Sequence, residues 1–279
     1  MQEHRFHYQS ETLSYYTAGS PDNPPIILIH GYTSSHYVWR QTIPALENHF
    51  YCIAIDLMGH GTSDILPDGD YSIETQGKRV LALADELGIE KFILIGHSMG
   101  GQIAMCIAAL LAPERVEKLL DLDGVAAGHL VESLEKRTQL LVNTAYYFPL
   151  FENMTRWTNI SYRWGAKTQF VSWFYNFDAL PFDEWRIDRE MANQSGMRYT
   201  WYYGLDAILK LDLTAHLSKI SVPTLVIFGK HDAVVPLSDG YLVHEQIPNS
   251  QLIVIDNCGH FPMYEATEAY LEALRGFLL

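Results

Sequence analysis

The sequence predicts an α/β fold, with a mostly parallel central sheet that is flanked by helices and interrupted by an inserted helical segment. Short apolar runs alternate with helix-length amphipathic stretches in residues 26–123, and the same pattern returns in residues 224–279. The middle of the chain is instead rich in aromatic residues. With 279 residues, of which 48% are hydrophobic, the chain is long enough to bury the core of one large α/β domain.

The first elements along the chain are an edge hairpin and a series of buried strands. Polar and apolar residues alternate around 6–8 and 13–16, which predicts an antiparallel hairpin at the edge of the sheet. The apolar runs that follow predict strands at 26–30, 50–56, 92–96 and 116–123. Residues 75–87 place apolar side chains on one face and stop at Gly88, which is typical of a helix that connects two strands.

The last elements complete the same sheet, with strands at 224–228 and 251–255 and a closing helix at 266–279. We therefore assign residues 1–124 and 214–279 to a core domain and residues 125–213 to an inserted helical cap. As a group, the aromatic residues of this cap predict the roof of an apolar pocket. Any single one of them is explained by packing within the cap or against the core domain. They include Tyr146, Tyr147, Phe148, Trp157, Trp164, Trp173, Phe174, Tyr175, Trp185, Trp201, Tyr202 and Tyr203.

A serine with the surroundings of a nucleophile follows the strand at 92–96. The sequence Gly96-His97-Ser98-Met99-Gly100 matches the pattern G-x-S-x-G and leads into a helical run over 102–111. A sharp turn between strand and helix holds its central residue in unfavourable backbone geometry, and only small neighbours such as the two glycines leave room for it. The start of the helix also directs N–H groups toward developing negative charge. We therefore expect Ser98 to be the nucleophile.

With this motif, the chain resembles the α/β-hydrolase superfamily over nearly its full length. In that family the acid and the histidine follow the serine in the order Ser, Asp or Glu, His. Asp232 follows the strand at 224–228 and His260 follows the strand at 251–255, at the carboxyl ends where α/β sheets place their sites. The resemblance implies a triad of Ser98, His260 and Asp232. Asp123, at the end of the strand at 116–123, competes for the role of the acid, because some relatives draw their acid from that position.

The resemblance also implies an oxyanion hole. His30-Gly31-Tyr32 is similar to the family's His-Gly-X signature, so the N–H groups of Tyr32 and Met99 are expected to hold the oxyanion, with Gly31 permitting close backbone approach. His97 is expected to pack and form hydrogen bonds rather than act as the base. The stretch from Asp56 to Ser63 matches the family's D-x-x-G-x-G-x-S loop, which we interpret as structural, with His60 at the surface or in a loop.

The identity of the nucleophile narrows the reaction. The superfamily's haloalkane dehalogenases and epoxide hydrolases need an aspartate where this chain has Ser98, so acyl transfer to water remains. Because the cap is aromatic and nearly free of clustered cations, we expect esters of small to medium, mainly apolar substrates. This is the activity of a carboxylesterase.

Other readings stay open from the sequence. They are a carbon–carbon hydrolase of the meta-cleavage-product type, a thioesterase, a lactonase, a perhydrolase, and a small-molecule receptor on a hydrolase fold. The carbon–carbon hydrolases typically carry a tryptophan after the catalytic histidine, where this chain has Phe261, although Arg189 or Arg198 could hold a substrate carboxylate. Acyl chain length, leaving group and stereochemical preference are not fixed by the motifs.

Charge and composition limit the partners. The net charge of −14 repels nucleic acid and anionic lipid, and no apolar run approaches the length of about 20 residues that crosses a bilayer. The N-terminus shows no signal or transit peptide, which favours the cytoplasm. Cys52, Cys106 and Cys258 are expected to be free buried thiols, and the histidines have no ligand spacing, so we expect neither a metal nor another cofactor. A monomer and a homodimer both remain open.

Overall fold

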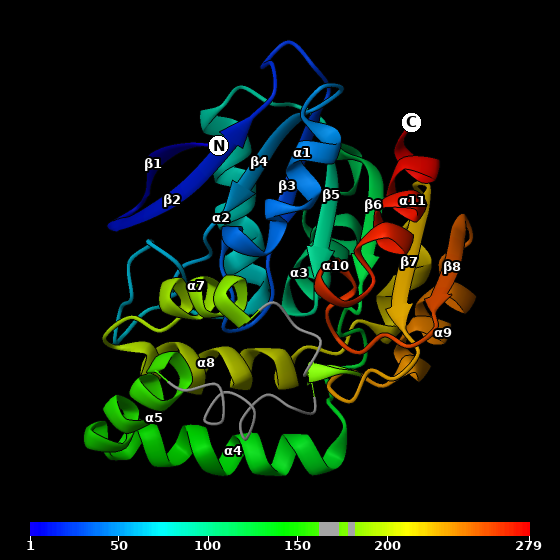
Figure 1. The fold of residues 1–279 in the computed structure, drawn as a ribbon. Coiled ribbons are helices and arrows are strands. Elements are labelled where there is room, and N and C mark those ends of the chain that lie inside the picture. The colour runs from blue at the N-terminus through cyan, green and yellow to red at the C-terminus, as the bar shows by residue number, and fades with distance from the viewer. Residues whose placement is uncertain (162–172, 178–181) are drawn as a thin grey trace.

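Eight strands form one sheet in the order β1-β2-β4-β3-β5-β6-β7-β8 in the computed structural model, which describes residues 1–161, 173–177 and 182–279 (Figure 1). Strands β1 and β2 form an antiparallel hairpin, β2 pairs antiparallel with β4, and all pairs from β4 onward are parallel. The predicted fold class is therefore confirmed. The strands are β1 Gln2–Tyr8, β2 Glu11–Ala18, β3 Pro25–Ile29, β4 Tyr51–Ile55, β5 Phe92–His97, β6 Val116–Leu122, β7 Thr224–Gly229 and β8 Ser250–Ile255.

Helices connect the strands and cover both faces of the sheet. They are α1 Thr42–Leu46, α2 Ile73–Glu86, α3 Met99–Cys106, α4 Glu132–Tyr147, α5 Pro149–Ser161, α7 Phe182–Ala192, α8 Met197–Lys210, α9 Leu237–Gln246, α10 Pro262–Glu265 and α11 Thr267–Leu278. Within the described residues, no helix is long and apolar enough to cross a membrane.

Alternate residues of the central strands supply two separate hydrophobic cores. In β3, Ile27 and Ile29 belong to the core that contains the buried faces of α2, α3 and α9, whereas Ile26 and Leu28 belong to the core that contains those of α1 and α11. This follows from the two-residue period of a strand, whose successive side chains point to opposite faces. A strand buried on both faces is apolar throughout, which is why these strands appear in the sequence as continuous apolar runs.

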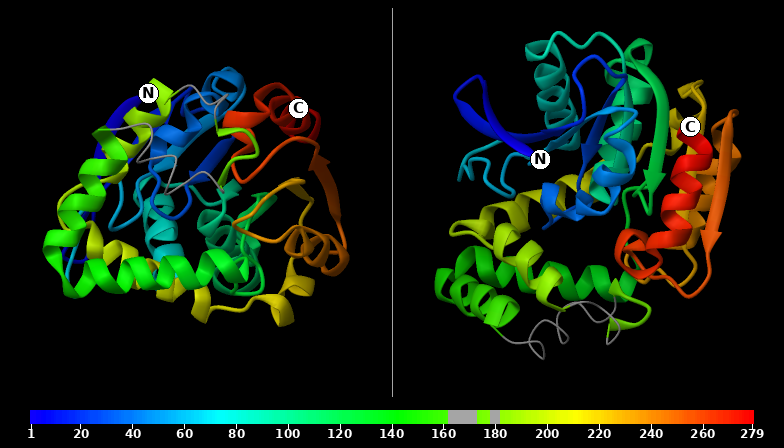
Figure 2. Two further views of the ribbon diagram at one scale, coloured as in Figure 1. Left: turned by 60° about the horizontal axis from the view of Figure 1, so that its bottom comes forward. Right: turned by 45° about the horizontal axis from the view of Figure 1, so that its top comes forward.

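Helices α4, α5, α7 and α8, which come between β6 and β7 in the chain, gather beyond the carboxyl ends of the parallel strands (Figures 1 and 2). Hydrogen bonds tie α8 to loops of the sheet. The Tyr32 hydroxyl donates to the carbonyl of Trp201 at 2.6 Å, and the Thr200 hydroxyl donates to the carbonyl of Gly59 at 2.7 Å. An ion pair between Arg40 and Glu184 attaches α7. The carboxyl ends of the strands are thereby covered by this helical layer.

Candidate active site

Ser98 lies in a strained turn between β5 and α3. Its backbone has φ 56° and ψ −118°, in the left-handed half of conformational space that non-glycine residues rarely adopt. A Cβ atom on Gly96 would lie 2.2 Å from the carbonyl oxygen of Gly100, and one on Gly100 would lie 2.1 Å from the carbonyl oxygen of Ile29. Only glycine fits at both positions, so the turn depends on the spacing that the sequence motif shows.

The loop at 30–32 passes directly over Ser98. A Cβ atom on Gly31 would lie 3.0 Å from the Cβ atom of Ser98, so the backbone approaches the serine closely at this point. Met99 begins α3, and the N–H groups in the first turn of a helix have no partner within the helix. The predicted oxyanion donors, the N–H groups of Tyr32 and Met99, therefore belong to two backbone segments that meet at Ser98.

His30 fixes the shape of this loop. Its Nε2 atom accepts a hydrogen bond from the N–H group of Leu57 at 3.1 Å, so Nδ1 carries the proton and donates to the carbonyl of Gly31 at 2.8 Å. Burial lowers the pKa of His30, which favours the neutral ring that both contacts require. His30 is thus a structural support for the loop above Ser98.

Asp232 and His260 form a buried hydrogen-bonded pair. The Nδ1 atom of His260 lies 2.7 Å from Oδ2 of Asp232, while Oδ1 of Asp232 accepts from the N–H groups of Val234 at 2.7 Å and Val235 at 3.1 Å. With Nδ1–H bound to the carboxylate, Nε2 of His260 is the nitrogen that can accept a proton.

Ser98 and His260 line the same cavity, which also brings Tyr32, His97 and Phe261 together. Among the hydrogen bonds of the described residues, none joins the Ser98 hydroxyl to the His260 ring. Catalytic hydrogen bonds are often long in an enzyme without substrate and shorten in the complex. The arrangement therefore suits a serine and a base that engage when substrate is bound.

His97 holds the backbone of His260. Its Nε2 atom lies 2.8 Å from the carbonyl oxygen of His260, and on the other side the His260 N–H group donates to the carbonyl of Trp173 at 2.8 Å. Burial, reinforced by the nearby His260, sets the pKa of His97 well below its usual value. His97 is therefore a neutral donor to the His260 carbonyl.

Glu265 is a residue of the site that sequence reasoning missed. Its Oε1 atom accepts from the N–H groups of Gly259 at 3.0 Å and Phe261 at 3.3 Å, and its Oε2 atom accepts from the N–H group of Tyr175 at 2.6 Å. Glu265 thus clamps the loop that carries His260 to residues 173–177. Burial raises the pKa of this carboxyl group, against the lowering effect of the N–H groups it binds.

Asp123, the alternative candidate for the acid of the triad, lies beside Asp232. It has φ 47°, is fully buried, and its Oδ1 atom accepts from the N–H group of Gly229 at 2.8 Å. One side-chain atom from each of Asp123, Asp232 and His260 lies within 4.8 Å of the other two. Three such donor atoms resemble a metal site in number, but two of these groups are already hydrogen-bonded to each other.

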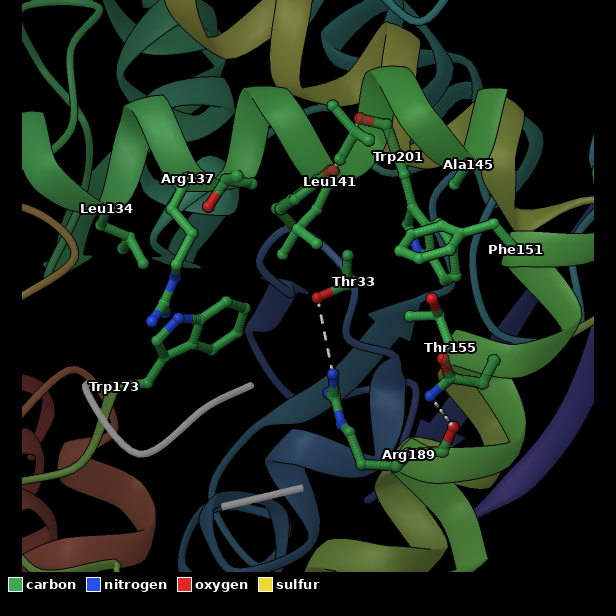
Figure 3. A pocket seen from close by; sticks show the side chains of 14 residues that line it. Thr33, Leu134, Arg137, Leu141, Ala145, Phe151, Thr155, Trp173, Arg189 and Trp201 are labelled. Atoms are coloured by element: carbon green, nitrogen blue, oxygen red, sulfur yellow. Dashed lines mark hydrogen bonds between the residues drawn. The ribbon is translucent and has the colours of Figure 1, made fainter. Parts of the chain in front are cut away.

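Two neighbouring chambers that share part of their lining lie between the sheet and the helical layer. The inner chamber contains Ser98 and His260, and the outer chamber lies between α4, α5 and α7 (Figure 3). Counting space that opens to solvent, the outer chamber measures about 640 Å³ and the inner about 440 Å³. The residues that line both are Tyr32, Leu134, Thr138 and Trp173.

The outer chamber is more cationic than the sequence predicts. Arg137 of α4 and Arg189 of α7 both line it and extend into the hollow (Figure 3). The expectation that the cap lacks clustered cations is therefore wrong, because two distant helices bring these arginines to one cavity. Arg189 is ion-paired with Asp188 at 2.5 Å, whereas Arg198 pairs with Glu152 at 2.8 Å and is not among the residues that line either chamber.

The loop from Asp56 to Ser63 is held by its own side chains. Oδ1 of Asp56 accepts from the N–H group of His36 at 2.7 Å, Oδ2 accepts from that of Thr62 at 2.9 Å, and the Ser63 hydroxyl donates to the Asp56 carbonyl at 2.6 Å. His60 lies in this loop, which is one of the two positions expected for it, and its ring is fully buried. That burial lowers the pKa of His60 to about 3, so the ring is neutral.

Comparison with known proteins finds relatives that cover most of the chain. It is 28% identical over 281 residues to the uncharacterized hydrolase YugF of Bacillus subtilis (strain 168), covering 98% of this chain and 97% of that protein. It is 29% identical to a 2-hydroxy-6-oxononadienedioate/2-hydroxy-6-oxononatrienedioate hydrolase of Cupriavidus pinatubonensis, covering 91% and 86% of the two chains. A further relative is 3-oxoadipate enol-lactonase 2 of Acinetobacter baylyi, 28% identical, with 97% and 94% covered.

A solved structure shows the same fold. The enol-lactonase from Burkholderia xenovorans LB400 superposes with a TM-score of 0.83 at 22% identity, covering 98% of this chain and 99% of the other. A family model described as the alpha/beta hydrolase fold matches residues 24–267. The chain therefore belongs to the α/β-hydrolase family.

Proposed function

We propose that this protein hydrolyses carboxylic esters of small to medium, mainly apolar substrates through Ser98, His260 and Asp232. The observation that carries the proposal is the meeting of three parts in one chamber. They are a serine in a strained turn, a loop that crosses within contact distance of it, and a histidine whose Nδ1 is bound to a buried aspartate.

The proposed reaction has two stages. The Ser98 oxygen attacks the acyl carbon while Nε2 of His260 takes the serine proton, and the N–H groups of Tyr32 and Met99 hold the oxyanion. His260 then gives the proton to the leaving alcohol, which departs and leaves an acyl-enzyme. Water then attacks the acyl-enzyme in the same two steps and releases the carboxylic acid. Asp232 holds the imidazole in the required tautomer and stabilises its charged form throughout.

The lining of the inner chamber favours apolar groups on the substrate. It includes Leu130, Leu134, Leu205, Ile208 and Val234. We propose that residues 125–213 form a cap over the core domain of residues 1–124 and 214–279, and that substrate reaches Ser98 beneath it. All three cysteines are free and buried, which suits a reducing compartment, so we place the proposed esterase in the cytoplasm.

A second candidate is hydrolysis of a carbon–carbon bond or a lactone in a substrate that carries a carboxylate. The observation that favours it is the pair Arg137 and Arg189 in the lining of the outer chamber. Two relatives have names that specify a dioate or an oxoadipate derivative. Against it, Phe261 stands where the carbon–carbon hydrolases typically carry tryptophan, and it stacks on Phe174 at 5.1 Å between ring centroids.

A fluorophosphonate probe and a substrate panel test these proposals. We expect the probe to label the wild-type protein on Ser98 and to leave Ser98→Ala unlabelled; labelling that survives Ser98→Ala contradicts the assignment. Wild-type protein is then assayed with p-nitrophenyl acetate and butyrate, a thioester, a lactone and a vinylogous diketone that carries a carboxylate.

The pattern of turnover separates the candidates. Fastest turnover of the neutral esters, with little change in Arg137→Gln, supports the esterase. Fastest turnover of the carboxylate substrates, with a raised KM in Arg137→Gln, supports the second candidate. A single slow turnover with tight retention of the ligand would instead indicate a receptor and overturn both.

A further inference from the structure

The carboxyl group of Asp123 presents an unexplained polar atom beside the proposed triad. Its Oδ1 atom accepts from Gly229, but no donor among the described residues lies within hydrogen-bonding distance of Oδ2, although the residue is fully buried. An ionised carboxylate oxygen without a donor is costly in such a place. The atom therefore either carries a proton or is paired with a group that shares one.

Asp232 is the neighbour with which a proton can be shared. One oxygen of each carboxyl group and one nitrogen of the His260 ring lie within 4.8 Å of one another. Two ionised carboxylates this close in a buried site would raise the free energy of each other, which favours a neutral form of one of them.

The hydrogen bonds decide which of the two is charged. Asp232 accepts from the His260 ring and from two backbone N–H groups, those of Val234 and Val235, and each of these donors favours the ionised form. Asp123 accepts from one backbone N–H group alone. Burial, together with the charge of Asp232, raises the pKa of Asp123 well above its usual range.

We propose that Asp123 is a neutral carboxylic acid that donates its proton in a hydrogen bond to Asp232, and that it thereby acts as a positioning residue for the His260–Asp232 pair. The role rests on the proposed function of that pair. Asp123 gives Asp232 a fourth donor, which restricts rotation of the carboxylate, while the cluster keeps a single negative charge beside His260. Neither aspartate needs to transfer its proton during the reaction, since His260 alone carries the proton between Ser98 and the leaving alcohol.

The Asp123→Asn variant imitates the neutral acid. Its amide oxygen can accept from Gly229 and its amide N–H group can donate to Asp232. We expect kcat within about twofold of the wild type, with an unchanged midpoint on the acid side of the kcat/KM profile. An ionised Asp123 gives the opposite result, because its replacement removes a charge beside His260, so the midpoint falls and kcat drops strongly.

The Asp123→Ala variant removes the donor. We expect kcat to fall about tenfold, because Asp232 loses a fixed partner, and the acid-side midpoint to rise, because Asp232 keeps more negative charge beside His260. The other titratable groups near Asp123 are Asp121 and Cys258, neither of which changes charge on the acid side. Asp121→Ala, on the same strand, is the matched control and should leave the profile unchanged.

Infrared spectroscopy detects the proton on the Asp123 carboxyl group directly and does not depend on turnover. At pH 7, the difference spectrum of wild type minus Asp123→Asn should show the C=O stretch of a protonated carboxylic acid, shifted in heavy water. Asp121 contributes equally to both spectra and cancels. A carboxylate band in place of the acid band overturns the proposal, even if Asp123→Ala fails to fold. Failure of the fluorophosphonate to label the wild type would overturn the proposed function instead and leave the infrared result standing.

Discussion

Asp121 is a buried acid whose contribution to the stability of the folded protein depends on pH. It lies at the end of β6, neither of its carboxylate oxygens has a donor among the described residues, and a Cβ atom on Gly124 would lie 1.9 Å from Oδ1. Burial, with a smaller effect from Asp239, raises the pKa of Asp121 to about 8. The folded protein therefore keeps a proton on Asp121 that the unfolded chain releases near the ordinary value of 3.8.

The raised pKa of Asp121 fixes the direction in which the free energy of unfolding changes with pH. A carboxyl group with a raised folded-state pKa contributes its full stability below about pH 4, and this contribution is lost as pH rises toward about 8. The loss amounts to about 1.4 kcal/mol for each pH unit. We expect Asp121→Asn, which cannot ionise, to change Tm little at pH 4.5 and to raise it clearly at pH 8. Thermal unfolding followed by circular dichroism measures this difference, and an equal change in Tm at both pH values would contradict it.

At the scale of the residue, the strained turn at Ser98 was predictable because a local motif fixes it. Ser98 and its glycines form a contiguous pattern that only one backbone turn accommodates. The position of Asp123 beside Asp232 was not predictable, because the sequence offers both as alternatives and only the parallel pairing of β6 with β7 brings them together. His60 lies in a loop, one of the two positions expected for it, but its burial beside His30 could not be predicted from the local sequence.

At the scale of the element, the strands were predicted to within a residue or two at most ends. Burial on both faces makes β3, β4 and β5 nearly continuous apolar runs, which stand out in the sequence. The closing helix predicted over 266–279 corresponds to α11, which runs over Thr267–Leu278. The short helix α10 lies before it, over Pro262–Glu265, and was not predicted. Ala266, whose backbone is not helical, separates the two helices.

The short helix α10 has a function that its sequence does not reveal, because Glu265 binds N–H groups of the His260 loop and of Tyr175. Tyr175 lies 90 positions away in the chain, so no periodic pattern could link the two. We expect Glu265→Ala to lower kcat about tenfold, with a smaller effect on KM, because two loops lose their common acceptor. Hydrogen exchange should also become faster at residues 173–177 and 257–261.

Glu268→Ala is the matched control for this prediction, because Glu268 is an exposed glutamate in the first turn of α11. It should leave kcat and exchange unchanged. Equal losses in both variants, or a loss of kcat without faster exchange in the two loops, would show that Glu265 does not act as the clamp.

At the scale of the whole molecule, the proposed reaction site is built from both the sheet and the helical layer. The sheet supplies Ser98, His260 and Asp232 from the ends of its strands, and the helices between β6 and β7 supply most of the outer chamber. Composition predicted an apolar roof, which the lining supports in the inner chamber. It could not predict the two arginines of the outer chamber, because their common position in its lining depends on how α4 and α7 are placed around the cavity.

The lining that the two chambers share gives the last prediction. Thr138 lines both, and we infer that substrates with long acyl chains pass it to reach from the inner chamber into the outer one, so that a larger side chain there would obstruct them. We expect Thr138→Phe to lower kcat/KM for p-nitrophenyl esters with long acyl chains about tenfold or more, while the acetate is hydrolysed at nearly the wild-type rate. Short substrates fit in the inner chamber, whereas long ones extend into the outer one. Asn143→Phe, an exposed position of α4 that lines neither chamber, is the control. If Thr138→Phe slowed acetate and long-chain esters equally, the way past Thr138 would not be the route by which long chains are accommodated.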